Sequence, residues 1–410
     1  MKNNWQVKKL GEVCEMINRG VSPKYTNSQG LCVLNQKCIR DHKIDFSLSR
    51  IHDVKNKKIN NEKLIRIGDV LVNSTGTGTL GRVAQVKNML FEAIVDSHVT
   101  IIRPIKNVFY NEFFGYALIF IETEISKKGA GCGGQIELAR DTLRNDFTIT
   151  YPESLTEQKR IVTILDKAFA NIDKAKENTE KNLQNVNDLF ESYLKSVFSN
   201  PKKNWQVKKL GDVCTIIGGG TPSKSNADFY NGNILWATVC DMKNEVIFDT
   251  KYKITLEAVK KSSTNIIPKN NIVIATRVGL GKICLLKNDT AINQDLRGII
   301  PKNTMNFSFK YLFWWLKSIS KIIVESGTGA TVQGVKLSFI KNLEIFTFPL
   351  REQQQIATKL DALSAQTKKL IDIYQKKIAN LEELKKSLLQ KAFTGELTDT
   401  AVNKNMELLL

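Results

Sequence analysis

The stretch "NWQVKKLGEVC" (Asn4–Cys14) returns two hundred residues later as "NWQVKKLGDVC" (Asn204–Cys214). Only one position differs, where Glu12 of the first copy is replaced by Asp212 in the second. A period of about two hundred residues is too long for a solenoid, whose units run from about 20 to 50 residues. The chain therefore contains a duplicated domain and not an array of small repeats.

Further matched stretches extend this duplication along the chain. "GAGCGGQIELARDTLRNDFTITYP" (Gly129–Pro152) is matched by "GTGATVQGVKLSFIKNLEIFTFP" (Gly327–Pro349), and "LTEQKRIVTILD" (Leu155–Asp166) by "LREQQQIATKLD" (Leu350–Asp361). Between the matched stretches the two halves differ in sequence. We therefore expect one fold, built twice, that presents two different surfaces.

The segment that follows each globular block has the pattern of a long helix. Apolar residues recur at steps of three and four over about five heptads without Pro or Gly, which is typical of a coiled coil. At 1.5 Å per residue each helix would reach roughly 60 Å. A single helix would expose its apolar stripe, so we expect the two helices to pair. The stripes comprise Ile161, Leu165, Ile172, Leu183, Val186, Phe190 and Tyr193 in the first helix, and Ile356, Leu360, Leu363, Leu370, Tyr374, Ile378, Leu381, Leu384 and Leu388 in the second.

These patterns predict an α+β protein in which two duplicated globular domains are joined by two long helices. The helices form an antiparallel coiled coil, and the arrangement is pseudo-two-fold symmetric. Short apolar runs such as "NIVIAT" and "GRVAQV" predict strands. Phe109–Ile125 and Phe307–Ile323 each predict one helix. The predicted division is residues 1–150 (first globular domain), 151–200 (central helix), 201–347 (second globular domain) and 348–410 (C-terminal helix and tail).

The positive charge of the chain is concentrated in the two globular blocks. The net charge is +19, from 60 Lys and Arg against 41 Asp and Glu. Residues 1–150 contribute +7 and residues 201–347 contribute +11, whereas the helical segments are nearly balanced. A generally basic composition would spread the excess more evenly. Localised positive charge favours a polyanionic partner, so we expect the blocks to bind nucleic acid.

Two glycine-rich stretches are similar to nucleotide-binding motifs but depart from them. "GTGTLG" (Gly76–Gly81) fits G-x-G-x-x-G, yet the chain continues as the strand pattern "RVAQV" and not as a helix that would bind a pyrophosphate. We interpret it as a tight turn that brings backbone N–H groups and Arg82, or Lys282 in the second copy, to a phosphate. "GGGTPSKS" has Ser223 where a Walker A loop requires glycine.

Composition also indicates the location of the protein. Seven cysteines without C-x-x-C spacing indicate reduced thiols in a cytoplasmic protein. The longest apolar run is about half a membrane span, and the first residues lack a hydrophobic signal segment. His42, His52 and His98 lie too far apart in sequence to suggest a metal site. We find no motif that indicates catalysis.

The order of the motifs resembles a known family. Each block opens with W-x-V-K-K-L-G-[DE]-V and closes with P-x-x-L-x-E-Q-x-x-I. Between and after these come "GGGTPSK", the turns "GTGTLGR" and "VGLGK", and the helix end "LLQKAFTGEL" (Leu388–Leu397). Together they resemble the specificity subunit (HsdS) of type I restriction-modification systems over residues 1–397. The first half departs from the pattern where "NRGVSPKY" replaces the Gly-Thr-Pro stretch.

This resemblance implies a non-catalytic subunit that reads DNA. Each globular block would be a target recognition domain for one half of a bipartite double-stranded site. The helices would set the spacing and bind two methyltransferase subunits, with restriction subunits joining that core. S-adenosylmethionine, ATP and Mg would be bound by those partners, with no cofactor and no metal on this chain. The alternatives are a coiled-coil scaffold without DNA readout and an enzyme with an unrecognised active site.

Candidate DNA-binding residues follow from the position of the loops. We expect phosphate contacts from Lys or Arg on the glycine-rich loops, and base contacts from polar side chains in the divergent segments. An ordinary solvated surface role is the alternative for each residue. The candidates are Lys24, Thr77, Arg82 and Gln135 in the first half, and Lys224, Arg277, Lys282 and Gln333 in the second.

Overall fold

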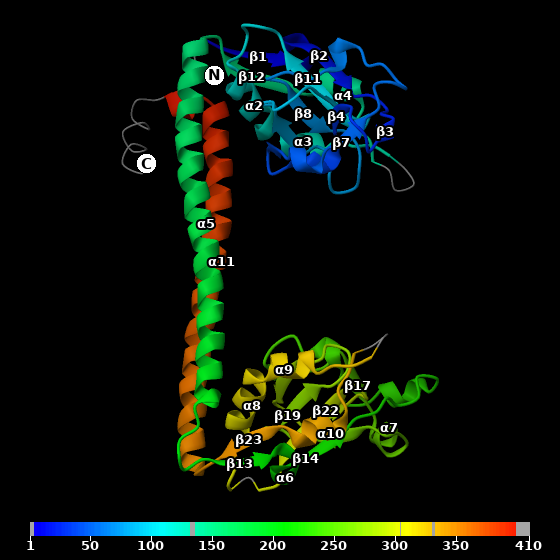
Figure 1. Cartoon of the computed structure of the whole chain (residues 1–410), viewed down its shortest axis with the longest axis vertical. Helices are drawn as coiled ribbons and strands as arrows, with labels where there is room; N and C mark the ends of the chain where they lie inside the picture. Colours follow the sequence, from blue (N-terminus) through cyan, green and yellow to red (C-terminus); the bar gives the residue numbers. More distant parts are fainter. Residues whose placement is uncertain (1–3, 132–135, 304, 330–332, 399–410) are drawn as a thin grey trace. The chain divides into compact units, whose positions relative to one another are not determined.

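The chain consists of two compact units, each with its own hydrophobic core, in a computed structural model (Figure 1). Unit 1 comprises Met1–Thr179 and Lys376–Leu410, and unit 2 comprises Glu180–Gln375. Each unit thus holds one globular block together with part of both long helices. The residues described are 4–131, 136–303, 305–329 and 333–398.

Unit 1 contains two four-stranded sheets formed mainly by short runs of Val, Ile and Leu. The first sheet is antiparallel, and in the second only the β10–β4 pair is parallel. The strand order of the first sheet is β2 (Cys14–Arg19), β11 (Val99–Pro104), β8 (Val70–Asn73) and β9 (Val83–Gln85). The strand order of the second sheet is β10 (Ala93–Val95), β4 (Leu31–Leu34), β7 (Arg50–His52) and β3 (Tyr25–Thr26). Shorter elements are α1 (Leu10–Val13), η1 (Gln36–Cys38), η2 (Phe46–Leu48), η3 (Asn61–Lys63), α4 (Arg140–Asp146) and the hairpin β5 (Ile39–Arg40) and β6 (Lys43–Ile44).

Unit 2 repeats this arrangement of sheets, but an extra strand of one sheet lies at a different edge. Its sheets have the orders β14 (Cys214–Gly218), β22 (Leu296–Pro301), β19 (Ile272–Ala275), β20 (Ile283–Leu286), β16 (Val246–Ile247), and β17 (Tyr252–Ile254), β15 (Ile234–Ala237), β21 (Thr290–Ile292), β18 (Asn265–Ile267). In unit 1 the extra strand β3 pairs with β7, whereas in unit 2 the extra strand β18 pairs with β21 at the opposite edge. The divergent segments therefore extend one framework at different edges. Shorter elements are α6 (Leu210–Val213), η4 (Ala227–Tyr230), η5 (Val239–Asp241), α7 (Leu256–Lys260) and α10 (Leu337–Asn342).

The repeated opening sequence forms the same local structure in both units. In unit 1, β1 (Trp5–Lys9) pairs antiparallel with β12 (Thr148–Pro152), the strand that leads into the first long helix. In unit 2, β13 (Gln206–Lys209) pairs in the same way with β23 (Glu344–Thr347). Trp5 packs against the core of unit 1. The ring of Trp205 stacks on Phe348 with centroids 4.0 Å apart, so both tryptophans pack within the framework of their units.

The prediction of one continuous helix at Phe109–Ile125 and at Phe307–Ile323 is wrong, because each stretch forms two short helices. They are α2 (Asn111–Phe120) and α3 (Glu122–Lys127) in unit 1, and α8 (Phe309–Ser318) and α9 (Ser320–Glu325) in unit 2. The break falls at Ile121 and Ile319, whose ψ of 4° and 8° leaves the helical region. The change of direction allows Ile125 and Ile323, both fully buried, to reach the cores.

The two long helices pack against each other inside each unit. They are α5 (Leu155–Ser199) and α11 (Leu350–Phe393). In unit 1, Lys176 forms an ion pair with Glu382 at 2.5 Å, and Asp173 pairs with Lys385. Because Asp173 precedes Lys176 while Lys385 follows Glu382, the helices run antiparallel there. No described helix is both long enough and apolar enough to cross a membrane.

Most of the predicted stripe is shielded from solvent, and part of it is not. Tyr193, Leu370 and Leu384 are 41%, 42% and 46% exposed, so their assignment to the packed seam is wrong. A straight helix drifts by about 20° per heptad relative to a strict repeat, which carries such positions off the seam. The residues that are buried or half-buried are Ile161, Leu165, Ile172, Leu183, Val186, Phe190, Ile356, Leu360, Leu363, Tyr374, Ile378, Leu381 and Leu388.

Candidate nucleic-acid interface

The glycine-rich turn of unit 1 joins β8 to β9, which agrees with the prediction of a turn between strands. Gly76, Gly78 and Gly81 have φ of 99°, 78° and 87°, a region that residues with a Cβ rarely adopt. The guanidinium of Arg82 donates to the carbonyl of Gly78 at 3.1 Å. No helix begins at this turn, so it lacks the helix N-terminus that a dinucleotide site requires.

A second loop, residues 136–138, lies directly beside this turn. The N–H of Leu138 donates to the carbonyl of Ser74 at 2.8 Å. From β2, the guanidinium of Arg19 donates to the carbonyl of Leu138 at 2.8 Å and forms an ion pair with Glu137. The loop is thus held to the glycine-rich turn by backbone hydrogen bonds and to β2 by side-chain contacts.

A third segment, the turn between β10 and β11, completes the cluster with polar side chains. The hydroxyl of Thr75 contacts Nδ1 of the exposed His98 at 2.8 Å and accepts from Nε2 of Gln36 at 2.8 Å. The N–H of His98 donates to the Asp96 carboxylate at 3.0 Å. Burial raises the pKa of Asp96, while this hydrogen bond acts in the opposite direction. The cluster thus presents hydroxyl, imidazole and amide groups on one surface.

Sequence reasoning missed Gln36 and His98 as parts of this surface. His98 had been interpreted only as an ordinary histidine. A signal was nevertheless present, because polar residues directly follow the apolar runs that form β4 and β10. These two strands are parallel neighbours, so their carboxyl ends lie at the same edge of the sheet.

Unit 2 contains the same three segments in the same arrangement. Its glycine-rich turn joins β19 to β20, with Gly279 and Gly281 at φ of 69° and 81°. The N–H of Thr276 donates to the carbonyl of Asp295 at 2.9 Å, as the N–H of Ser74 donates to that of His98 at 2.8 Å in unit 1. Asp295 therefore occupies the position of His98.

The side chains at these equivalent positions differ in chemistry. Arg277 directly follows Thr276, and Thr75 directly follows Ser74, so Arg277 and Thr75 are equivalent. The guanidinium of Arg277 lies 3.7 Å from the carboxylate of Asp295. Unit 1 thus presents a hydrogen-bonded Thr75–His98 pair where unit 2 presents an Arg277–Asp295 ion pair. Different sets of donors and acceptors distinguish different base edges in the DNA grooves. The two surfaces therefore present different sets of hydrogen-bonding groups.

Five of the predicted DNA-binding residues lie in these loop clusters. Thr77 and Arg82 belong to the turn of unit 1, and Arg277 and Lys282 to the turn of unit 2. Gln333 directly precedes Gly334, which lies against Arg277. A Cβ built on Gly334 would be 3.3 Å from Cγ of Arg277.

The other three predicted residues are placed differently. Lys24 precedes β3 in the second sheet of unit 1, and its N–H donates to Nδ1 of His52 at 2.9 Å. Lys224 lies in the exposed loop before η4, between Ser223 and Ser225. Gln135 is outside the described residues. The role of all eight candidates in DNA binding stays a prediction.

The three histidines have separate environments in unit 1. His42 contacts Glu122 at 2.6 Å, His52 is fully buried, and His98 contacts Thr75. Among the described residues, no group of three or more His, Cys, Asp or Glu could hold a metal ion.

One framework built twice, with an exposed loop cluster of different chemistry in each copy, defines a duplicated recognition protein. Comparison with protein families agrees with this class. The family described as the type I restriction modification DNA specificity domain matches residues 2–184 and residues 202–383. The chain belongs to this family.

Individual relatives match over different lengths. The MjaIX specificity subunit of a type I restriction enzyme from Methanocaldococcus jannaschii is 35% identical over 180 residues, which span 42% of each chain. The putative MjaX specificity subunit of the same organism is 25% identical over 96% of this chain and 94% of its own length. A solved chain, described under complex assembly and conformational transition of the type I R-M system, has a TM-score of 0.80. At 19% identity over 96% of this chain and 98% of that one, it shows the same fold.

Proposed function

We propose that this chain is the DNA specificity subunit of a type I restriction-modification complex. The globular part of each unit reads one half of a bipartite double-stranded DNA site. The long helices α5 and α11 fix the gap between the half-sites and bind two methyltransferase subunits, which restriction subunits join. The printed names of the relatives, which are specificity subunits of type I restriction enzymes, support this assignment.

The observation that carries the proposal is the difference between equivalent positions of the two loop clusters. Thr75 and His98 in unit 1 correspond to Arg277 and Asp295 in unit 2, on turns with the same backbone hydrogen bonds. A duplicated scaffold without readout would not require different polar groups at equivalent positions of the two turns. Two independent readers of two different half-sites do require them.

The chemical steps of modification and restriction are assigned to the partners. S-adenosylmethionine, ATP and Mg would be bound by the methyltransferase and restriction subunits, and this chain would bind no cofactor. It would act in the cytoplasm, where the DNA is accessible. Accordingly, the purified chain alone is expected neither to methylate nor to cleave DNA, and transfer of a radiolabelled methyl group by the chain alone would contradict this.

The test is an exchange of one reader. Residues 15–145 are replaced by the equivalent block of another family member, and methylated sites are mapped by sequencing modified bases in cells that carry the methyltransferase subunit. One half of the recognised sequence should change while the other half and the gap stay the same. Exchange of residues 215–343 should change the other half. If either exchange altered both halves together, the units would not be independent readers.

A further inference from the structure

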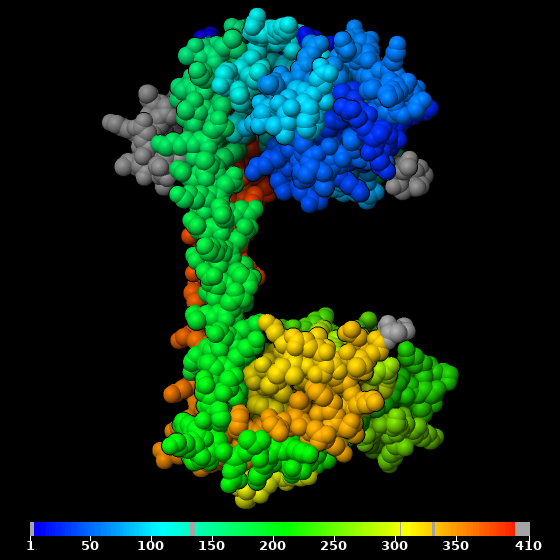
Figure 2. Space-filling view, in the orientation of Figure 1, coloured from blue at the N-terminus to red at the C-terminus, as the bar shows by residue number. Residues whose placement is uncertain are grey.

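A basic cavity lies in unit 2 where the globular part meets α11. It has a volume of about 530 Å³. The loop between η5 and β16, strand β20, helix α8 and helix α11 all contribute to its walls. The α8–α9 segment beside it lies on the face of unit 2 drawn in Figure 2, where it is yellow. Its charged lining residues are four lysines, Lys243, Lys282, Lys317 and Lys368, and one acid, Glu245.

Most of this positive charge is not neutralised within the protein. Glu245 forms an ion pair with Lys368 at 2.5 Å. Among the described residues, no salt bridge involves Lys243, Lys282 or Lys317. The ammonium of Lys317 lies 5.7 Å from the ring centroid of Phe313, which keeps it extended along α8. Three lysines therefore remain available to an anionic ligand.

Lys282 and Lys317 line the cavity together with the buried thiol of Cys284. Burial raises the pKa of Cys284 to about 11, while the charges of Lys317 and Lys282 both act to lower it. Cys284 belongs to β20, directly after the glycine-rich turn that ends in Lys282. The cavity is thus continuous with the loop cluster of unit 2.

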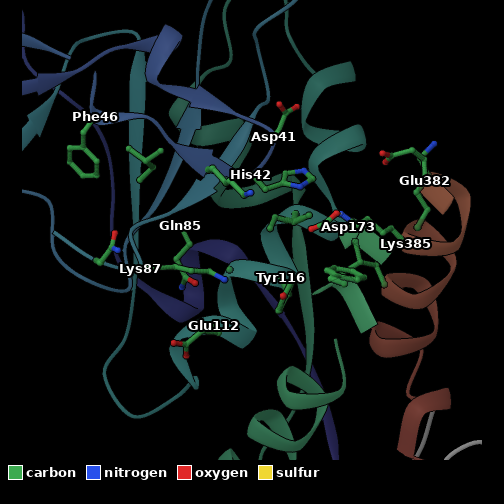
Figure 3. A pocket seen from close by; sticks show the side chains of 18 residues that line it. Asp41, His42, Phe46, Gln85, Lys87, Glu112, Tyr116, Asp173, Glu382 and Lys385 are labelled. Atoms are coloured by element: carbon green, nitrogen blue, oxygen red, sulfur yellow. The ribbon is translucent and has the colours of Figure 1, made fainter. Parts of the chain in front are cut away.

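The corresponding cavity of unit 1 has a similar size but balanced charge. It measures about 520 Å³ and lies between the β5–β6 hairpin, α2, α5 and α11 (Figure 3). Lys385 pairs with Asp173, and the ammonium of Lys87 lies 5.6 Å from the ring centroid of Tyr116. Its charged lining residues, apart from His42, are Lys43, Lys87, Lys385 and Lys386 against Asp41, Glu112, Asp173 and Glu382.

Equivalent positions explain the difference in charge. The hydroxyl of Tyr116 donates to Asp166 at 2.5 Å, and the indole N–H of Trp314 donates to Asp361 at 2.9 Å, so these pairs correspond. The third residue after Tyr116 is Ile119 in unit 1, and the third residue after Trp314 is Lys317 in unit 2. Seven residues beyond the aspartate, unit 1 has Asp173 where unit 2 has Lys368. The same site of the fold is therefore neutral in one unit and cationic in the other.

We propose that the cavity of unit 2 binds backbone phosphate of the DNA through Lys243 and Lys317, beside the contact from Lys282. As a consequence, unit 2 contributes more of the salt-dependent affinity than unit 1. This inference rests on the proposed DNA-reading function. Lysine binds phosphate as a flexible point charge, and each neutralised phosphate adds about 0.9 to the slope of log affinity against log salt. An acidic protein segment is the competing ligand, but continuity with the recognition turn favours DNA.

The experiment measures DNA binding of the complex with its methyltransferase subunits at a series of salt concentrations. The double variant Lys243→Ala/Lys317→Ala should lower the magnitude of the slope by about 2 and weaken specific and nonspecific DNA equally. Arginine at both positions should retain the slope. The matched control is Lys87→Ala/Lys386→Ala in the balanced cavity of unit 1, which should change the slope by much less.

The outcomes separate this inference from the proposed function. An unchanged slope in the Lys243/Lys317 variant, with sequence-specific binding by the wild-type complex, would overturn the phosphate site alone. Equal losses in the variants of both units would overturn the asymmetry. Loss of methyltransferase assembly at an unchanged slope would show that the cavity binds protein. A wild-type complex without sequence-specific DNA binding would overturn the proposed function as well.

Discussion

Gln158 and Gln353 occupy the same position in the two units and make the same set of hydrogen bonds. Oε1 of Gln158 accepts from the N–H of Tyr110 at 2.7 Å. Its Nε2 donates to the carbonyls of Val108 at 3.1 Å and Pro152 at 2.8 Å. Both glutamine residues are fully buried. The amide therefore ties the first turn of α5 to the loop before α2 and to the end of β12.

The second copy repeats these contacts. Oε1 of Gln353 accepts from the N–H of Ser308 at 3.0 Å, and its Nε2 donates to the carbonyls of Asn306 at 3.1 Å and Phe348 at 2.8 Å. The repeated glutamine in the first turn of each long helix is thus explained by packing. It orients the helix against the globular part and has no need of a direct role in DNA binding.

Replacing Gln353 with leucine should destabilise unit 2. The change leaves the buried carbonyl of Phe348 without this partner, and an unpaired buried group costs about 1–3 kcal/mol. It also removes the partner of the part-buried N–H of Ser308 and carbonyl of Asn306. The free energy of unfolding of unit 2 should fall by about 1–3 kcal/mol, measured by hydrogen exchange of its protected amides. Gln354→Leu is the control, because that adjacent side chain is exposed. Equal effects of the two variants would contradict the packing role.

Replacing Arg82 or Lys282 with alanine should weaken binding to all DNA sequences by a similar factor. Each side chain is placed at the end of a glycine-rich turn and is proposed to contact a phosphate, which carries no base identity. The salt dependence should flatten by about one unit per residue, as measured by titrations from low to high salt. A changed base preference at an unaltered slope would mean that these residues read bases.

Replacing His98 or Asp295 with alanine should alter base preference in one half-site only. The two residues occupy equivalent positions in separate units, so each variant should relax a different half of the recognised sequence. Loss of one good base contact costs about 1–3 kcal/mol, or roughly tenfold to a hundredfold in discrimination. Sequencing of methylated bases after expression of each variant gives the result. A uniform loss of methylation without relaxed sequence preference would argue against base contact.

The cysteines should differ strongly in their reactivity toward alkylating reagents. Burial raises the pKa of Cys38 and of Cys284 to about 11, whereas Cys240 is exposed. Because the thiolate is the nucleophile, only about one in a thousand of the buried thiols is reactive at pH 8. Of the cysteines in the described residues, Cys240 should therefore be modified first in a mass-spectrometric time course. Labelling of Cys38 and Cys284 should rise as the pH approaches 11, and rapid labelling at pH 8 would contradict the burial.

Insertion of four residues after Asn178 should change the gap between the half-sites. The insertion point lies in α5 beside Thr179, where the first segment of unit 1 ends. Four residues lengthen a helix by about 6 Å, near two base-pair steps, and turn the following part by roughly 40°. A four-residue stutter can be absorbed by local unwinding of a coiled coil. The half-site sequences should persist while the gap grows, as shown by mapping methylated sites. An unchanged gap at full activity would show that α5 is not the spacer.

Much of the framework could be predicted from the sequence because it depends on local sequence patterns that occur in both halves of the chain. Heptad spacing without Pro or Gly predicted α5 and α11, and a glycine-rich stretch followed by a strand pattern predicted a turn. The matched openings predicted one fold built twice, and β1 and β13 both pair with the strand before a long helix. Comparing the copies also located the divergent segments, which extend the sheets at different edges.

Only the tertiary structure decided which residues from distant segments act together. Local periodicity could not reveal the helix breaks at Ile121 and Ile319, because burial of Ile125 and Ile323 in the cores determines them. Gln36 and His98 are brought to the same edge by the parallel pairing of β4 with β10, and Thr75 joins them because β8 pairs with β11.

The cationic cavity depends in the same way on long-range packing. Lys243, Lys317 and Lys368 come from a loop and two helices that are separated by about fifty residues or more in sequence. Each alone is an ordinary surface lysine. Charge becomes a property of a site only when folding fixes the distances between groups, because electrostatic interaction depends on separation in space and not on separation along the chain.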